Sequence, residues 1–181
     1  MKLVVFFGYK GGGKTTAIEA TVRAMKKAGL KVGTIKHVHE PSFSIDTPGK
    51  DTWRHAKAGA SAVAVVARHE VAVIQKRDTR RLTAREVAEA LGGGLDFVLV
   101  EGMHGKTGPP RGAVHGICAE DVGQAEKLLR LHPGARFVTG RVAVGKRGCS
   151  ALGVPYVVLP EDGAMLLRIL TKGGGRGKQY T

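Results

Sequence analysis

Residues 3–16 read LVVFFGYKGGGKTT, an apolar run followed by a glycine-rich loop that ends in lysine and threonine. The loop from Gly8 to Thr15 fits the pattern G-x-x-x-x-G-K-S/T at every fixed position. The run before it predicts a short buried strand, and Ile18, Val22 and Met25 after it recur at the spacing of a helix. A strand, this loop and a helix in that order predict a site for the phosphates of a nucleotide.

The chemistry of this loop follows from its residue types. Glycines allow successive backbone N–H groups to curl around an anion, and the helix that begins near Lys14 directs the positive end of its dipole at the same place. We therefore predict that Lys14 contacts the β- and γ-phosphates, that the Thr15 hydroxyl binds Mg²⁺ and that Thr16 binds the α-phosphate. The predicted phosphate-binding residues are Gly11, Gly12, Gly13, Lys14, Thr15 and Thr16.

Residues 31–36 (KVGTIK) predict a second strand, and the resulting strand–helix–strand unit indicates a parallel α/β sheet. Later strands are predicted at residues 95–100, 114–119, 135–139 and 154–159, and later helices at 51–58, 83–91, 121–131 and 163–171. The runs at 61–67 and 70–75 predict a β-hairpin that extends the sheet or forms a dimer contact.

These elements predict one α/β domain over residues 1–172. We expect a three-layer P-loop NTPase fold, with a mostly parallel sheet and helices on both faces. Residues 173–181 are rich in glycine and basic residues and predict a flexible basic tail.

An acidic partner for the loop is expected at the end of a buried strand. The apolar run at 95–100 (LDFVLV) predicts a central strand that ends at Glu101. The carboxyl ends of parallel strands lie at one edge of the sheet, so Glu101 is predicted to face Mg²⁺ or its water. Asp96 begins the same strand and is predicted to lie at the wrong edge to reach the phosphates.

The polar segment 37–60 follows the second strand, so its start is predicted at the same edge of the sheet. Asp46 or Asp51 is predicted to hold Mg²⁺ or a catalytic water. The basic side chains that would bind anions are Lys50, Arg54, His55 and Lys57. From the residues alone, an ordinary polar loop and helix cap is an equally good interpretation.

The charge balance favours anionic ligands, because 29 Lys and Arg residues face 15 Asp and Glu residues, for a net charge of +14. Aromatic residues make up only 5% and do not cluster, so nucleic acid is not the favoured partner. No apolar run reaches the roughly 18 residues that a membrane helix needs. Two cysteines without a CxxC pair favour a reducing compartment, and the predicted location is the cytoplasm.

Four stretches in order carry a family resemblance: GYKGGGKTT at 8–16, TIKHVHE at 34–40, FSIDTPGKDTWRHAKAGA at 43–60 and LVEG at 99–102. Over roughly residues 1–103 the chain resembles the MobB family, adapters of molybdopterin-guanine dinucleotide biosynthesis. The long third stretch is the most specific part. After VEG the family commonly continues with an aromatic residue and a lysine, whereas here Met103 and His104 follow.

The resemblance implies GTP binding, Mg²⁺, a weak GTPase activity and a homodimer. It also implies a partner, the guanylyltransferase that joins GMP to molybdopterin. Molybdopterin itself is a candidate ligand, because it carries a phosphate that the positive charge would attract. Carried over residue by residue, it places phosphate at Gly11, Gly13, Lys14, Thr15 and Thr16, and the metal-facing acid at Glu101. Asp46, Lys50, Asp51, Arg54 and His55 fall in the family's signature segment. GTP rather than ATP rests on the resemblance alone, because the chain has no NKxD-type tetrapeptide to read guanine.

Two other functions stay open. A small P-loop kinase would need an arginine-bearing lid, for which only residues 76–81 (KRDTRR) are dense enough in arginine. A nucleic-acid-associated NTPase is suggested by the charge of +14. Whether the chain is an enzyme also stays open, because its hydrolysis of GTP would be weak at most.

Overall fold

The computed structural model describes residues 1–103, 109–141 and 152–172, so the predicted tail at 173–181 lies outside the described residues. The chain forms two compact units. Unit 1 consists of Met1–His37 and Thr83–Thr181, and unit 2 of Val38–Leu82. The single domain predicted over residues 1–172 stays a prediction. Within the described ranges, every helix is too short or too polar to cross a membrane.

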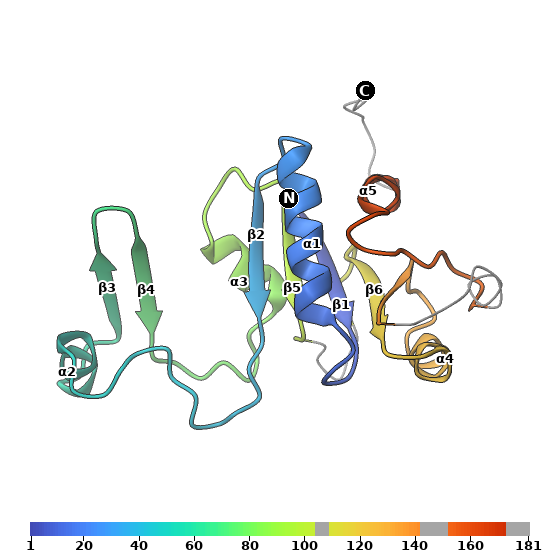
Figure 1. The fold of residues 1–181 in the computed structure, drawn as a ribbon. Helices are drawn as coiled ribbons and strands as arrows, with labels where there is room; N and C mark the ends of the chain where they lie inside the picture. Colours follow the sequence, from blue (N-terminus) through green and yellow to red (C-terminus); the bar gives the residue numbers. More distant parts are fainter. Residues whose placement is uncertain (104–108, 142–151, 173–181) are drawn as a thin grey trace. The chain divides into compact units, whose positions relative to one another are not determined.

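Unit 1 is built on a five-stranded sheet in the order β2-β5-β1-β6-β7, in which every pairing is parallel (Figure 1). The strands are β1 (Lys2–Phe7), β2 (Val32–Lys36), β5 (Phe97–Glu101), β6 (Val114–Ala119) and β7 (Val138–Gly140). β1 lies at the centre and leads into the glycine loop. The parallel sheet confirms the predicted fold class.

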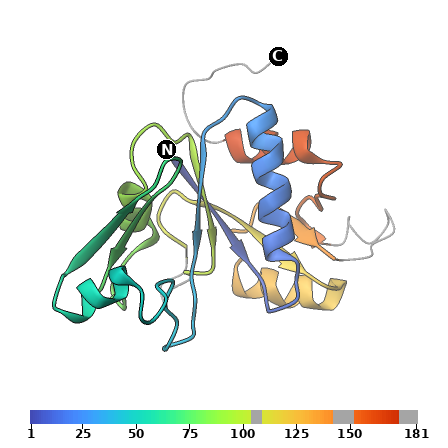
Figure 2. The ribbon, with the colours of Figure 1, turned by 60° about the vertical axis from the view of Figure 1, so that its left-hand side comes forward.

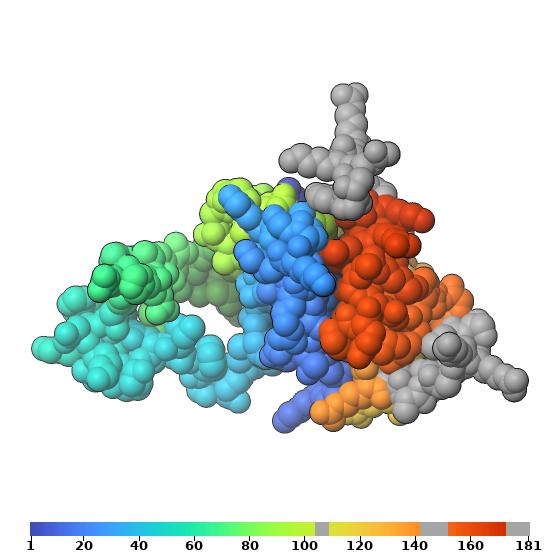
Figure 3. Space-filling model, turned by 45° about the horizontal axis from the view of Figure 1, so that its top comes forward, coloured from blue at the N-terminus to red at the C-terminus, as the bar shows by residue number. Residues whose placement is uncertain are grey.

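The two faces of the sheet are covered by different helices, as the alternation along β1 requires. Leu3, Val5 and Phe7 enter a core that includes residues of α3 (Ala84–Ala90) and α4 (Val122–Leu131). Val4 and Phe6 enter a second core with α1 (Lys14–Lys27) and α5 (Gly163–Thr171). These two helices lie side by side (Figures 2 and 3), and a Cβ placed at Gly163 would lie 3.1 Å from Ala24 Cβ. Unit 1 therefore has three layers.

Unit 2 contains α2 (Asp51–Lys57) and the antiparallel strands β3 (Ala62–Val66) and β4 (Val71–Gln75). The predicted hairpin is confirmed. Its strands form a two-stranded sheet of their own, so the alternative in which the hairpin extends the main sheet is wrong.

The strand predictions fail only near the C-terminal end of the sheet. β7 begins at Val138 rather than residue 135, because the backbone forms a turn at Ala135, whose N–H donates a hydrogen bond to His132 O at 2.9 Å. The strand predicted at 154–159 is reduced to one isolated bridge between Tyr156 and Val138. Pro155 and Pro160 explain this, since proline has no N–H to donate to a sheet.

A pair of histidines beside β1 predicts a pH-dependent stability. The His115 ring meets Phe7 edge-on at 5.6 Å, and the His132 ring stacks on Phe7 at 4.1 Å. Burial, and then the nearby His132, lower the pKa of His115, and burial lowers the pKa of His132. Below about pH 6.5 the unfolded chain therefore binds more protons at these histidines than the folded chain does. Their contribution to the free energy of unfolding is fully present above that pH and is lost as the pH falls.

The measurement is the urea midpoint between pH 7.5 and pH 5. We expect the midpoint to fall on acidification, and to fall less in His115→Leu than in the unchanged protein. His69→Leu removes an exposed histidine of unit 2 and serves as the control, with the unchanged acid response. An equal fall in all three proteins would contradict a role for His115.

Candidate functional site

The glycine loop joins β1 to α1 and leaves the start of that helix open. Gly13 occupies the N-cap in the left-handed conformation, with φ 82°, and supplies no side-chain hydrogen bond. The first turn of α1 contains no acidic residue. Its backbone N–H groups and positive dipole end therefore have no side-chain anion of their own helix beside them, as an anion-binding helix requires.

The loop packs directly on the neighbouring strand β6. A Cβ placed at Gly12 would lie 2.7 Å from the carbonyl oxygen of Cys118, which leaves no space for any other residue there. Burial raises the pKa of the Cys118 thiol to about 12, so this sulfur is a packing group rather than a nucleophile. The second cysteine, Cys149, lies outside the described residues.

Lys14 folds back over the loop that precedes it. Its Nζ donates hydrogen bonds to the carbonyl oxygens of Gly8 at 2.9 Å and Tyr9 at 2.7 Å. The ammonium is thus held next to the loop by two neutral acceptors, which a phosphate oxygen would replace with a stronger, charge-assisted partner. Gly11, Gly12, Gly13, Lys14, Thr15 and Thr16 all lie together here, as one loop and one helix start.

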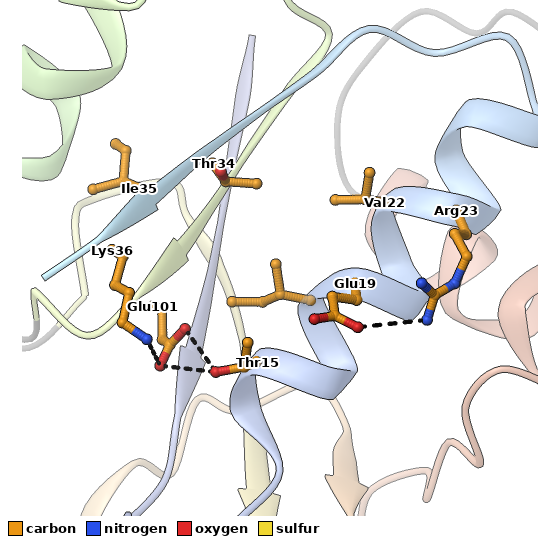
Figure 4. A pocket seen from close by; sticks show the side chains of 9 residues that line it. Thr15, Glu19, Val22, Arg23, Thr34, Ile35, Lys36 and Glu101 are labelled. Carbon is orange, nitrogen blue, oxygen red and sulfur yellow. Dashed lines mark hydrogen bonds and ion pairs between the residues drawn. The ribbon is translucent and has the colours of Figure 1, made fainter.

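The predicted acid meets the loop from the end of β5 (Figure 4). Thr15 Oγ1 lies 3.2 Å from Glu101 Oε2 and 3.4 Å from Oε1. The carboxylate is 15% exposed, and Lys36 Nζ lies 3.3 Å from its Oε1. Strand register explains the meeting, because Glu101 pairs with Phe6 of β1 on one side and with Lys36 of β2 on the other. Asp96, at the other end of β5, accepts a hydrogen bond from Lys31 N at 2.8 Å, at the edge predicted for it.

A groove of about 370 Å³ continues from this pair between α1 and β2. Ile18, Val22 and Ile35 give it an apolar lining, and Glu19 and Arg23 form an ion pair of 3.8 Å along α1 (Figure 4). Thr15 and Glu101 therefore stand at the end of an open channel, where a ligand larger than a metal ion has access.

The predicted residues of the signature segment lie in unit 2. Asp46 is 8% exposed; its Oδ1 accepts a hydrogen bond from Thr52 Oγ1 at 2.7 Å. Its Oδ2 is buried and has no hydrogen-bond partner among the described residues. Lys50 is the N-cap of α2, and its helix carries Asp51, Arg54 and His55 on exposed positions. Arg54 and Asp51 form an exposed ion pair of 3.6 Å.

The arginine-dense stretch 76–81 also belongs to unit 2. Arg80 forms an ion pair with Asp78, with an Nη2–Oδ2 distance of 2.7 Å. This pairing holds the pKa of the Asp78 carboxyl below its usual range. The pair is formed by neighbours in sequence. It gives the kinase interpretation no support.

Three charged residues near the loop were not singled out by the sequence. Lys36 could have been found as the last residue of a predicted strand at the same edge as Glu101. The Glu120 carboxylate lies against Gly11, and Arg141 lies against Gly13. These two follow β6 and β7, and only the strand order brings them to the loop.

Known proteins that resemble this chain share one family. The model of the MobB family, described as molybdopterin guanine dinucleotide synthesis protein B, matches residues 3–115. The chain is 33% identical over 103 residues to the molybdopterin-guanine dinucleotide biosynthesis adapter protein of Escherichia coli K12, covering 56% of this chain and 58% of that protein. It is 35% identical over 97 residues to the protein of the same name from Haemophilus influenzae, covering 53% of each. The chain thus spans about half the length of these curated relatives.

Solved structures extend the likeness of the fold to nearly the whole chain. Bacillus subtilis MobB superposes with a TM-score of 0.67 at 23% identity, covering 96% of this chain and all 100% of that one. A MobB homolog from Bacillus stearothermophilus gives a TM-score of 0.60 at 24% identity, covering 94% and 98%. At these identities the structures speak for the fold. The family model matches more than half of the sequence, and this chain therefore belongs to the MobB family.

Proposed function

We propose that this chain is a GTP-binding adapter in the synthesis of molybdopterin-guanine dinucleotide, with at most a weak GTPase activity. The observation that carries the proposal is the meeting of Thr15 and Glu101 beside an uncapped helix start. The names of the curated relatives supply the pathway. The residues of the loop supply the chemistry for one part of this role, which is the binding of a nucleotide.

Mg²⁺ fits the oxygen atoms at the end of β5. A threonine hydroxyl and a carboxylate, 3.2 Å apart, are the hard ligands that this ion takes. Among the described residues, no group of three His, Cys, Asp or Glu side chains could hold a metal. Phosphate oxygens and water would therefore complete the coordination, and the ion would supply charge neutralisation at the phosphates. Lys36 holds the Glu101 carboxylate in place through its ion pair.

Asp46 and α2 are assigned a supporting role. The buried Oδ2 of Asp46 has an unused acceptor, which suits it to orient a water or a cation. Lys50, Asp51, Arg54 and His55 are assigned to an anionic ligand, because three of the four are basic and all are exposed. The net charge of +14 would draw GTP and the phosphate of molybdopterin to such a surface.

A homodimer formed through the hairpin is the second part of the proposal. Val66, Val71 and Val73 lie on one face of the two-stranded sheet and are 77%, 66% and 62% exposed. An isolated hairpin is marginally stable in water, and a second copy would cover this apolar face. Light scattering should give a dimer for the unchanged protein and a monomer for Val71→Lys/Val73→Lys. Glu89→Lys, which makes the same change in net charge at an exposed position of α3 outside the hairpin, is the control and should stay dimeric.

The function itself is tested by equilibrium binding of GTP and ATP with Mg²⁺, with and without molybdopterin, at two salt concentrations. Preference for GTP together with an effect of molybdopterin supports the adapter. Preference for ATP with indifference to molybdopterin would move the assignment to a kinase. Binding of single-stranded nucleic acid that falls steeply with salt would favour a nucleic-acid NTPase. Co-sedimentation with the guanylyltransferase tests the protein partner.

Glu101→Gln should weaken Mg²⁺-dependent hydrolysis about 10- to 100-fold, with a much smaller loss of GTP affinity. The amide keeps the shape of the side chain and removes the charge that faces the metal. Single-turnover hydrolysis and calorimetric binding measure the two effects. The matched control is Glu19→Gln, which removes a carboxylate from the same groove, one turn of α1 after Thr15. Equal losses of hydrolysis and binding in Glu101→Gln would indicate a structural role instead.

A further inference from the structure

A second cavity opens on the other side of the start of α1. It has a volume of about 170 Å³ and lies between two walls. One wall is the helix start, with Gly13, Thr16 and Ala17; the other wall consists of Thr139, Gly140, Arg141 and Leu159. None of these described lining residues is acidic.

The two threonines of the loop set the direction in which a nucleotide lies. Thr15 lines the groove on the side of β5 and β2, next to Glu101, where the metal-bound end of the phosphates belongs. Thr16 lines the cavity on the side of β7. If Thr16 binds the α-phosphate, the nucleoside leaves the phosphate chain on the β7 side and enters this cavity.

The β7 wall is held rigidly against the loop. Gly140 has φ 117°, and a Cβ there would lie 2.7 Å from Gly12 O and closer still to Ala119 O, so only glycine fits. The next residue, Arg141, donates its backbone N–H to Ala119 O at 2.8 Å. A Cβ placed at Gly13 would lie 3.8 Å from Arg141 Cγ, which puts the arginine stem over the loop. Among the described residues, no acidic side chain forms an ion pair with Arg141.

We infer that this cavity takes the nucleoside end of the nucleotide and that Arg141 selects guanine over adenine. Guanine presents two acceptors, O6 and N7, along one edge, and the planar fork of an arginine donates to both. Adenine presents an amino donor in place of O6 and is rejected. A carboxylate that reads the opposite, donor edge of guanine is not among the described lining residues. The inference rests on the proposed function, because it requires a nucleotide at the loop.

The experiment measures the affinities of GTP, ITP and ATP with Mg²⁺ for the full chain, for Arg141→Leu and for Arg136→Leu. ITP keeps O6 and N7 but lacks the amino group on the other edge of guanine. We expect GTP and ITP to bind alike and about 10-fold more tightly than ATP. Arg141→Leu should weaken GTP and ITP to the level of ATP and leave ATP unchanged. Arg136→Leu removes an equal charge from an exposed position before β7 and should change none of the three.

The other outcomes separate the inference from the proposed function. ITP that binds as weakly as ATP would mean that guanine is read at its amino edge, and it overturns the role of Arg141. Equal losses of GTP and ATP in Arg141→Leu overturn it too, since they mark a phosphate or ribose contact; in both cases nucleotide binding at the loop survives. No preference for GTP in the unchanged protein overturns the inference as well. Absence of all nucleotide binding overturns both proposals.

Discussion

Lys14→Ala should lower the affinity for GTP by about 100-fold or more, which in most assays means that binding is lost. The lysine ammonium supplies two or more charge-assisted hydrogen bonds to phosphate, each worth about 1.5–3 kcal/mol. In the absence of a phosphate this group bonds the carbonyls of Gly8 and Tyr9, which remain able to bond water when the lysine is removed. The fold should therefore survive, and calorimetry should report a loss of binding rather than of protein.

The control is Lys10→Ala, which removes an exposed lysine from the same loop. Both variants remove one positive charge, so a loss of long-range electrostatic attraction to GTP alone would lower the affinity equally in both. We expect the Lys10 variant to change the affinity by a few-fold at most. Comparable losses in the two variants would show that the loop attracts phosphate only by its overall charge. Unchanged affinity in Lys14→Ala would remove the site from this loop altogether.

Gly116→Ala should destabilise the fold by about 3 kcal/mol, at the upper end of what overpacking costs in a core. Gly116 lies on β6 where the Phe137 ring passes, and a Cβ there would collide with three of its ring carbons. The ring has no way to retreat, because Phe137 is fully buried and meets Phe6 edge-on at 5.8 Å. Urea unfolding measures the loss.

Two further variants make this result specific. Gly123→Ala adds the same methyl group to an exposed position of α4 and should slightly raise the stability, since alanine favours a helix over glycine. Gly116→Ala/Phe137→Leu replaces the ring by a smaller side chain. Its loss should be smaller than the sum of the two single losses, because the collision is relieved. Strict additivity would mean that Gly116 and Phe137 do not interact.

The first half of unit 1 could be predicted because its signals are local. An apolar run, a fixed loop pattern and a helical spacing follow one another over residues 3–25, and the capping box of Thr83 and Glu86 marks the start of α3. The position of Glu101 near the loop could be predicted for the same reason, because this residue ends an apolar run. Such patterns depend on neighbours in sequence, and the structure reproduces them within one or two residues.

The parts that failed depend on strand order, which no local pattern contains. Lys36 meets Glu101 only because β5 lies beside β2, and Arg141 reaches the loop only because β7 lies two strands from β1. The segment at 154–159 has the valines of a strand, but prolines at 155 and 160 leave it a single bridge. Tertiary contacts decided the positions of Lys36 and Arg141, whereas the prolines at 155 and 160 are a local signal against a strand.

The position of β1 has a consequence for how this chain is made. β1 precedes β2 in the chain, yet it does not pair with β2; its partners β5 and β6 begin at Phe97 and Val114. The long segments between β1 and these two partners are therefore synthesised before the central strand gains a neighbour. Closing loops of that length slows folding, and the nascent valine- and phenylalanine-rich run stays open to other chains meanwhile. The strand at the centre of the sheet is thus the one whose pairings require the longest segments of chain to close.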